Sequence, residues 1–225
     1  MNAQATAIVP MRHWSRRVPQ KNYRPFGGIP LYRHIVETLL SASCVTQVVI
    51  DTDSEYILRD AAETFPRVVL YERPSDLRGE MLNANDIMVN TLRHVATDAD
   101  VILQTHSTNP LLRADTIDRA INEFACSPTH DCLLSVTPIQ KRYWTADAQP
   151  LNHDRHALLR TQDLPPLFEE NSCIYLFHRH QFLHTGSRIG DRPMLFPIET
   201  AEALDIDTEF DWKLVEAIHA IRSAR

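Results

Sequence analysis

Positive charge is concentrated in one short stretch near the start of the chain. The segment RHWSRRVPQKN, residues 12–22, contains Arg12, Arg16, Arg17 and Lys21, although the protein of 225 residues carries a formal net charge of −6. Guanidinium groups bind phosphate oxygens in a bidentate manner, and a lysine ammonium adds a mobile point charge. Cations spaced in this way could hold a polyphosphate. The alternative is a solvated basic loop, which is an equally common reason for such a cluster.

Two carboxylates lie close together near the other end of the chain. In EALDIDTEFDW, Asp205 and Asp207 are two residues apart, so extended backbone would place both on one side. Paired oxygen ligands are a typical seat for Mg²⁺ when a substrate phosphate and water complete the octahedron. The alternative is helix capping, with Asp207 or Thr208 as the cap and with Glu209 and Asp211 in the first turn. Together, the cationic loop and the carboxylate pair indicate metal-assisted phosphoryl or nucleotidyl transfer.

The order of apolar segments predicts how these groups are positioned. Short apolar runs alternate with segments whose apolar residues repeat at helical spacing. This alternation predicts an α/β fold with a mostly parallel sheet, helices on both faces and ligands at the carboxyl ends of the strands. The expected strands are 5–10, 47–51, 67–71, 100–104, 132–137 and 173–177. The expected helical stripes are Leu31, Ile35 and Leu39; Ile57, Ala61 and Phe65; Met88, Leu92 and Val95; Ile117, Ile121 and Phe124; and Phe210, Leu214, Ile218 and Ile221.

Length and composition predict one folded domain over residues 1–225. The chain is 44% hydrophobic and 23% charged, which is too apolar for a disordered protein. One stretch, at about 138–170, breaks the alternation and is rich in proline. We expect this stretch to form an irregular arm that covers a site or reaches a partner subunit.

Composition also argues against several classes of function. The acidic net charge provides no general field to attract nucleic acid or an anionic membrane surface, so we expect neither partner. No apolar stretch approaches the roughly 20 residues that span a bilayer. The four cysteines form no C-x-x-C pair and no signal peptide precedes them, which predicts reduced thiols in a cytoplasmic protein. Only five glycines occur, without a dinucleotide or Walker loop, so phosphate binding must use side chains.

Several separate segments resemble the acylneuraminate cytidylyltransferases, also called CMP-sialic acid synthetases. AIVPMRHWSRRVPQKN is followed in the right order by PFGGIPLYRHIVETLL, VVIDTDSEYI, YERPSDLRGE, LQTHSTNPLLRADTIDRAI, LLRTQDLPPLFEENSCIYLF and RIGDRPMLFPIETAEALDIDTEFDW. The resemblance implies a Rossmann-like, three-layer nucleotide-diphospho-sugar transferase fold. It implies that CTP and a nine-carbon 2-keto sugar acid react to give the CMP-sugar and pyrophosphate, with Mg²⁺ as cofactor. It also implies a homodimer in which the arm pairs two subunits.

The resemblance implies roles for individual residues. The catalytic residues are expected to be Arg12, Arg16, Lys21 and Asp207. Nucleotide binding is expected from Arg12, Ser15, Lys21, Asn22, Arg73, Asn83 and Asn85. Sugar binding is expected from Gln104, Lys141, Arg160 and Asn171, of which Lys141 and Arg160 lie on the arm and would serve the partner's sugar site. The metal is expected at Asp205 and Asp207.

Some positions depart from the family pattern. His13 replaces a glycine and Arg16 replaces a lysine within the cationic loop. The serine-rich stretch of the family reads MLNANDIMVN, which leaves Asn83, Asn85 and Asp86 to contact the nucleotide, and the usual Q-P-T-S-P-x-R run is QTHSTNPLLR. We expect these departures to affect which sugar is bound more than the use of CTP. Sialic, legionaminic and pseudaminic acids therefore all remain open.

Two other functions remain as alternatives. The first is a cytidylyltransferase for another acid sugar, such as an octulosonate, against which PQKN and RTQDLP argue. The second is a non-catalytic nucleotide- or sugar-binding relative, suggested by His13 and Arg16. Asp205 and Asp207 argue against this second alternative, because a pure binding protein has less need of a paired metal seat.

Overall fold

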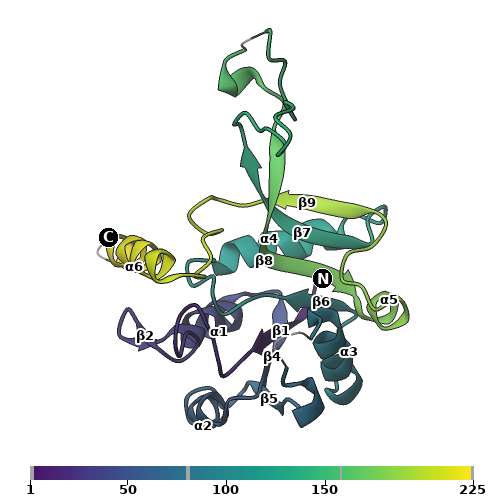
Figure 1. Ribbon diagram of the computed structural model, residues 1–225. Helices are drawn as coiled ribbons and strands as arrows, with labels where there is room; N and C mark the ends of the chain where they lie inside the picture. Colours follow the sequence, from purple (N-terminus) through teal and green to yellow (C-terminus); the bar gives the residue numbers. More distant parts are fainter. Residues whose placement is uncertain (1–2, 80–81, 158, 224–225) are drawn as a thin grey trace.

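A seven-stranded sheet forms the centre of the computed structural model, which describes residues 3–79, 82–157 and 159–223 (Figure 1). The strands lie in the order β5-β4-β1-β6-β8-β7-β9. Neighbours pair in parallel except β8, which runs antiparallel to both β6 and β7. Their bounds are β1 Ala5–Met11, β4 Val45–Thr52, β5 Val69–Glu72, β6 Val101–Gln104, β7 Cys132–Ile139, β8 Leu167–His178 and β9 Pro193–Pro197.

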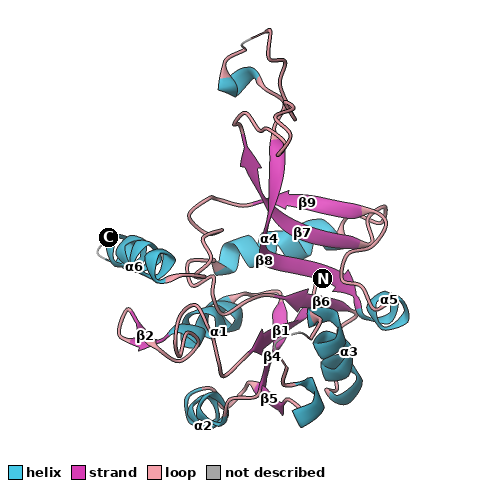
Figure 2. Cartoon of the chain, in the orientation of Figure 1, coloured by secondary structure: helices cyan, strands magenta, loops and turns pink. Residues whose placement is uncertain are grey.

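Helices cover both faces of this sheet, as Figure 2 shows. They are α1 Leu31–Ser41, α2 Glu55–Thr64, α3 Ala84–His94, α4 Ala114–Ala125, α5 Arg179–Thr185 and α6 Glu209–Ser223. A small hairpin of β2 Pro25–Phe26 and β3 Ile29–Pro30 precedes α1, and two single-turn 3₁₀ helices span Ser75–Leu77 and Thr161–Asp163. The predicted three-layer α/β architecture is therefore confirmed.

Side-chain alternation along the strands divides the core into two layers. In β1, Ala7 and Val9 belong to one buried cluster with α1, α2 and α4, whereas Ile8 belongs to a second cluster with α3 and α5. Successive strand residues point to opposite faces, and here both faces are covered. This double burial explains why the strands read as continuous apolar runs rather than as alternating ones.

The six strands expected from the sequence are all present, and four of the five helical stripes are buried. The stripes of α1, α2 and α4, for example, include Ile35, Ile57 and Ile121, none of which has exposed area. Strand β9, helix α5 and the β2–β3 hairpin were not predicted. These elements are short, so they contain too few residues to show a period.

The predicted stripe of the last helix is wrong. Phe210 and Ile221 are 73% and 61% exposed, whereas Trp212 and Val215 are buried. The buried pair packs against the β2–β3 hairpin, where the rings of Phe26 and Trp212 lie 5.6 Å apart. Helix α6 has apolar residues on more than one side, so periodicity alone could not identify the side that docks.

The irregular arm lies between β7 and β8 and extends away from the body of the molecule (Figure 1). The paired strands continue to Ile139 and begin again at Leu167, so the irregular part is 140–166, shorter than predicted at both ends. Within it, Trp144 and Pro150 form an isolated antiparallel bridge. The chain thus projects a segment that has few contacts of its own with the core.

The cysteines and the helices agree with two further expectations. Cys44, Cys126, Cys132 and Cys173 are all free thiols. Within the described ranges, no helix combines the length and apolar character needed to cross a bilayer.

Burial on α6 predicts opposite results for two aromatic truncations. Trp212→Ala should destabilise the protein by about 3–5 kcal/mol, because it removes a buried ring and leaves a cavity. Phe210→Ala, on the exposed side of the same helix, should change stability by less than about 0.5 kcal/mol. Thermal unfolding measures both, at roughly 2–4 °C per kcal/mol for a chain of this length. Equal losses for the two variants would contradict the docking of α6 described here.

Candidate functional site

A cavity of about 850 Å³ opens at the carboxyl ends of the parallel strands. The loop after β1, the segments after β4 and β6, and the chain before α6 all contribute to its wall. It brings together residues that are almost two hundred positions apart. The lining includes Arg12, Ser15, Arg16, Lys21, Asn22, Arg73, Gln104, Asp205 and Asp207, which were predicted, and Trp14, Arg17, Asp53, Arg78, His106, Ser107, Thr108, Asn109, Ser172 and Arg188, which were not.

Asn22 fixes the shape of the cationic loop. Its side-chain amide donates to the backbone oxygen of Arg12 over 2.7 Å, so it closes the loop from within. Its carbonyl oxygen accepts from Ser107 Oγ at 2.7 Å, which connects the loop to the segment after β6. Because Asn22 is 8% exposed, these bonds are shielded from competing water. The predicted nucleotide-contacting residue thus also holds the loop in place.

His13 occupies the position where a glycine was expected, and it anchors the loop to β4. Its backbone N–H donates to Asp53 Oδ1 at 2.6 Å, and its Nδ1 shares a hydrogen bond of 2.8 Å with Ser54 Oγ. Its ring stacks on Tyr23 with the centroids 5.1 Å apart. The side chain of His13 therefore holds the loop against Ser54, which follows β4, and against Tyr23.

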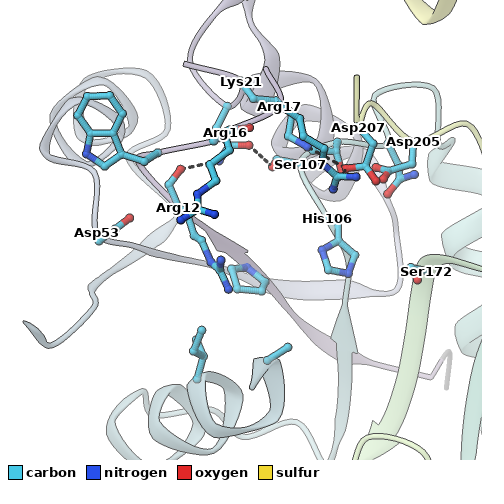
Figure 3. A pocket seen from close by; sticks show the side chains of 18 of the residues that line it. Arg12, Arg16, Arg17, Lys21, Asp53, His106, Ser107, Ser172, Asp205 and Asp207 are labelled. Carbon is cyan, nitrogen blue, oxygen red and sulfur yellow. Dashed lines mark hydrogen bonds and ion pairs between the residues drawn. The ribbon is translucent and has the colours of Figure 1, made fainter. Parts of the chain in front are cut away.

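The cations of the loop face the cavity, and Figure 3 shows two groups of them. Arg12 and Arg16 lie together at one side, whereas Arg17 and Lys21 lie beside the aspartate pair. Lys21 is only 13% exposed and donates to the backbone oxygen of Ile206 at 2.7 Å. Guanidinium and ammonium groups at a concave surface attract polyanions, since the surrounding low-dielectric walls strengthen their field. The position of these cations at a cavity therefore favours triphosphate binding over the alternative of a solvated basic loop.

Asp205 and Asp207 lie next to each other at the cavity wall (Figure 3). Asp207 Oδ1 accepts from Arg17 Nη2 at 2.7 Å and from Lys21 Nζ at 3.3 Å. The pKa of Asp205 is raised because the cavity wall limits hydration of its carboxylate and because Asp207 repels its charge, while a hydrogen bond from Thr108 opposes the rise. Two carboxylates so close together favour a shared cation.

The first turn of α6 is capped by other residues. Asp211 Oδ2 accepts from the backbone N–H of Thr208 at 2.7 Å, and Thr208 Oγ1 accepts from the N–H of Asp211 at 3.2 Å. This reciprocal pair is a capping box. The capping interpretation of the acidic segment is therefore correct for two of its residues. Capping involves Thr208 and Asp211, which leaves Asp205 and the side chain of Asp207 directed to the cavity.

The donor set fits a hard divalent cation that also binds substrate. Within the described ranges no group of three or more His, Cys, Asp or Glu side chains could hold a metal ion by protein ligands alone. Mg²⁺ commonly takes one or two carboxylates and completes its octahedron with phosphate oxygens and water. Asp205 and Asp207 supply that number of ligands beside the cations that would hold a phosphate.

Gln104 is a buried polar side chain whose hydrogen-bonding groups are not used. It ends β6, has no exposed area, and neither its Oε1 nor its Nε2 has a hydrogen-bond partner within the described structure. The hydroxyl of the next residue, Thr105, is in the same condition. Buried polar atoms without partners are costly, so their presence in a cavity wall indicates a ligand that supplies the missing bonds. Gln104 was predicted to bind the sugar.

Arg73 lies at the opposite wall and is held by a buried ion pair. It is 2% exposed, and its Nε donates to Asp51 Oδ1 at 2.8 Å. Burial raises the pKa of Asp51, while Arg73 and a hydrogen bond from Thr91 oppose that rise. Arg73 lines the predicted nucleotide half of the cavity as a rigid residue.

Three predicted asparagines do not appear in the cavity wall. Asn83 caps α3, where its side chain accepts from the backbone N–H of Asn85 at 2.9 Å. Asn171 accepts from Ser135 Oγ at 2.6 Å and donates to Thr137 Oγ1 at 3.1 Å, so it connects β8 to β7. Their ligand contacts stay predictions, and the contacts observed here are structural.

The arm cations also lie away from the cavity of their own chain. Arg160 pairs with Asp163 on the arm at 2.7 Å and is 74% exposed. Lys141 lies at the base of the arm and is exposed. Neither residue lines the cavity. A role for them in the sugar site of a partner subunit stays a prediction.

Sequence reasoning missed residues that enter the cavity through turns. Ser172 reaches it at an irregularity of β8, where residues 171–174 face Ser135 alone and where Ser172 has a φ of 59°. Arg188 reaches it from the turn after α5. The signal for Arg188 was a single arginine next to glycines in HTGSRIGD, which no period distinguishes from a surface turn.

No role was predicted for His106. It lies in the cavity wall, with Arg12 on one side and Ser172 on the other in Figure 3. Desolvation, with repulsion from Arg188 and Lys21, lowers the pKa of His106 to about 4. Its imidazole is therefore neutral at neutral pH, so it adds no positive charge to the cavity.

Comparison with known proteins shows similar chains among cytidylyltransferases and a synthase of CMP-activated sugar acids. The chain is 28% identical over 224 residues, 94% of each chain, to a CMP-N,N′-diacetyllegionaminic acid synthase of Legionella pneumophila. It is 21% identical over 222 residues, 95% of each chain, to a pseudaminic acid cytidylyltransferase of Campylobacter jejuni. It is 22% identical over 218 residues, 94% of this chain and 50% of the other, to N-acylneuraminate cytidylyltransferase A of Danio rerio.

Solved structures share the fold. A CMP:2-keto-3-deoxy-manno-octonic acid synthetase complexed with CTP superposes with a TM-score of 0.72 at 16% identity, covering 98% of this chain and 100% of the other. A 4-diphosphocytidyl-2C-methyl-D-erythritol synthase of Anaerococcus prevotii gives a TM-score of 0.72 at 9% identity, covering 97% of each. The family model described as Cytidylyltransferase matches residues 6–213. The chain therefore belongs to the cytidylyltransferase family of nucleotidyltransferase enzymes.

Proposed function

We propose that the protein transfers CMP from CTP to a nine-carbon 2-keto acid sugar and releases pyrophosphate. The observation that carries this proposal is the composition of one cavity. It combines phosphate-binding cations, a carboxylate pair for a metal, and Gln104 with unused hydrogen-bonding groups. The names of the similar proteins support the acid sugar, since they refer to legionaminic, pseudaminic and N-acylneuraminic acids.

The proposed reaction replaces a phosphoanhydride bond of CTP by a phosphodiester bond to the sugar. A bond forms between the anomeric oxygen of the sugar and the α-phosphorus of CTP, and the bond from that phosphorus to the bridging oxygen of the β-phosphate breaks. The proton of the anomeric hydroxyl passes to solvent water, and pyrophosphate leaves with the electron pair. Catalysis of this kind depends on positioning and on stabilising negative charge. Arg12, Arg16 and Lys21 are placed to hold the β- and γ-phosphates as the charge on pyrophosphate develops.

We propose Mg²⁺ as the cofactor, with Asp205 and Asp207 as its protein ligands. The bound ion would neutralise charge on the phosphate oxygens of CTP. Arg17 and Lys21 keep Asp207 oriented toward the cavity, and the capping box keeps it from turning to the helix. These contacts support Asp207 as a ligand held toward the cavity without substrate.

The identity of the sugar is the open part of the proposal. The chain resembles enzymes for several nonulosonic acids at similar levels of identity, so the names do not decide between them. The structural likeness to an octulosonate enzyme concerns the fold. A carboxylated sugar is favoured because the cavity wall carries Arg188 in addition to the cations of the loop after β1, and the names of the similar proteins favour a nine-carbon acid.

Pyrophosphate release tests the proposal directly. With CTP and Mg²⁺, one of N-acetylneuraminate, N,N′-diacetyllegionaminate and pseudaminate should support release, whereas octulosonate should support at least about ten times less. ATP, GTP and UTP should be poor donors with the same sugar. A protein that binds CTP, as judged by its melting temperature, but turns over none of the acids would favour the non-catalytic alternative. Preference for octulosonate would replace the substrate class.

The aspartate pair predicts loss of chemistry without loss of fold. Asp207→Asn should lower turnover by about 10²- to 10³-fold, because a metal ligand is lost where transition-state charge develops. The melting temperature should change little, because Arg17 and Asp207 are 64% and 40% exposed and such ion pairs contribute little to stability, and because asparagine keeps an oxygen that can accept from Lys21. Removal of divalent cations by EDTA should have the same effect on the unchanged protein. Glu63→Gln, an exposed acidic change on α2, is the control and should retain full turnover.

We also propose that the arm pairs two copies of the chain in the cytoplasm. Trp144, Leu151 and Leu159 are 53%, 61% and 54% exposed on a segment that extends away from the core, and the free thiols suit a reducing compartment. Light scattering should give twice the mass of the chain. The double variant Trp144→Ser with Leu151→Ser should shift it to the monomer at micromolar concentration. A monomeric unchanged protein would refute the pairing.

A further inference from the structure

Arg188 presents an unused guanidinium to the cavity. The residue lines the wall, and its Nη1 is buried without a hydrogen-bond partner in the described structure. Nor does it form an ion pair with any described acidic residue within 4.0 Å. Arginine carries five donors in a planar fork and stays protonated, so leaving buried donors unused is costly. The group is therefore suited to an anion that arrives with the substrate.

The turn that carries Arg188 has a fixed backbone conformation. Helix α5 ends at Gly186, whose φ of 69° lets the chain reverse at a position where a side chain would be strained. On the two sides of Arg188, Ser187 Oγ donates to the backbone oxygen of Ile189 at 2.7 Å and accepts from its N–H at 3.3 Å. This reciprocal bonding holds the backbone of Arg188 in a fixed position.

The guanidinium itself rests on an aromatic platform. Its Cζ lies 3.9 Å from the centroid of the Tyr175 ring, a close cation–π contact. Tyr175 is fully buried, and its hydroxyl donates to Glu170 and lies 3.0 Å from Ser172 Oγ. A platform fixed at both its ring and its hydroxyl keeps the fork in one plane. Orientation of this kind is what bidentate recognition of a carboxylate requires.

The position of Arg188 separates it from the triphosphate cations. Tyr175 on β8 is the direct cross-strand partner of Gln104 on β6, so their side chains share a face of the sheet. Arg188 therefore lies on the Gln104 side of the cavity. Ser172, which bonds to the same tyrosine, lies across His106 from Arg12 and Arg16 in Figure 3. The cavity thus has a second cationic wall beyond the aspartate pair.

We propose that Arg188 binds the carboxylate of the acid sugar and sets the preference of the enzyme for acidic over neutral sugars. This inference rests on the proposed function and names the residue that recognises the carboxylate of the sugar. Gln104 then serves the hydroxyl or amide groups nearby, since its carbonyl and its NH₂ can each meet one. The carboxylate is read within a single chain, by a residue that was not predicted, and without a cation from the arm.

Comparison of an acid with its amide isolates this interaction. The unchanged protein and Arg188→Met would be assayed with CTP, Mg²⁺ and N,N′-diacetyllegionaminate, or the acid of the panel that reacts fastest, and with its C1 amide. The variant should raise KM for the acid roughly 10- to 100-fold, the effect of losing a charged hydrogen-bonding partner. KM for CTP should not change. The preference for acid over amide, as a ratio of kcat/KM, should fall close to one.

Two further variants keep the result interpretable. Arg192→Met alters an arginine in the same loop that is 66% exposed and lies outside the cavity wall, so it should retain the acid preference. Arg188→Lys keeps the charge but loses the planar fork, and it should retain part of the preference. Melting temperatures with and without CTP show whether each variant is folded. If Arg188→Met fails to fold, the lysine variant carries the test, and full retention of the acid preference in it would overturn the proposal.

The outcomes distinguish this inference from the proposed function. Unchanged acid preference in Arg188→Met would overturn it, as would a raised KM for CTP with an unchanged KM for sugar, which would assign Arg188 to the triphosphate. Calorimetry with CTP and EDTA gives a second readout that needs no turnover. There the unchanged protein should bind the acid more tightly than the amide, and Arg188→Met should not. Acid-selective binding without turnover would refute the proposed function while supporting the role of Arg188. Equal binding of acid and amide by the unchanged protein would overturn that role.

Discussion

The two ends of the chain meet where Asp207 pairs with Arg17 and Lys21, and the arrangement of the site depends on this closure. Exposed ion pairs alone would be too weak to close so long a loop. Apolar packing beneath them supplies the rest. Ile206 lies between the two aspartates in sequence and is buried with Val18 of the cationic loop and with other residues of α6 and the hairpin. Alternation along this extended segment sends Ile206 inward and the carboxylates outward. The carboxylates are therefore positioned by a hydrophobic contact.

Strand β8 runs antiparallel to β6 and so brings different residues to the cavity wall. Strand β6 has a parallel neighbour, β1, and an antiparallel neighbour, β8, so the strand pairing changes from parallel to antiparallel at β6. A purely parallel neighbour would bring only another carboxyl-terminal loop to this edge. The antiparallel strand instead passes Ser172 and Tyr175 beside Gln104, and its irregularity opposite Ser135 turns Ser172 to the cavity. Bulges commonly re-aim side chains in this way next to functional sites.

The sequence predicts those parts of the fold that rest on local patterns. Strands β1, β4, β5, β6, β7 and β8 are recognisable because both faces of the sheet are covered, and Asp205 and Asp207 because their spacing is short. The docking side of α6 was not predictable, since the choice between Phe210 and Trp212 is made by the hairpin that receives the helix. Asn83 shows a related limit: a polar residue before a helix could bind a ligand or cap the helix, and only coordinates show that it caps. No sequence pattern indicated Arg188, because its position depends on the turn at Gly186 and on its contact with the ring of Tyr175.

The division of positive charge between two walls has a consequence for how the substrates meet. CTP and an acid sugar both carry negative charge, so a single cationic patch would bind them as competitors. Here the triphosphate cations lie on the loop after β1, whereas Arg188 lies in the turn after α5 on the Gln104 side of the cavity, and neutral His106 also lines the cavity. Each anion can then be neutralised at its own end, and the uncharged anomeric hydroxyl is directed to the region between. Asp205 and Asp207 lie in the wall of the same cavity, where Arg17 and Lys21 offset part of their charge. The geometry thus brings the reacting atoms together while it holds the two anions apart.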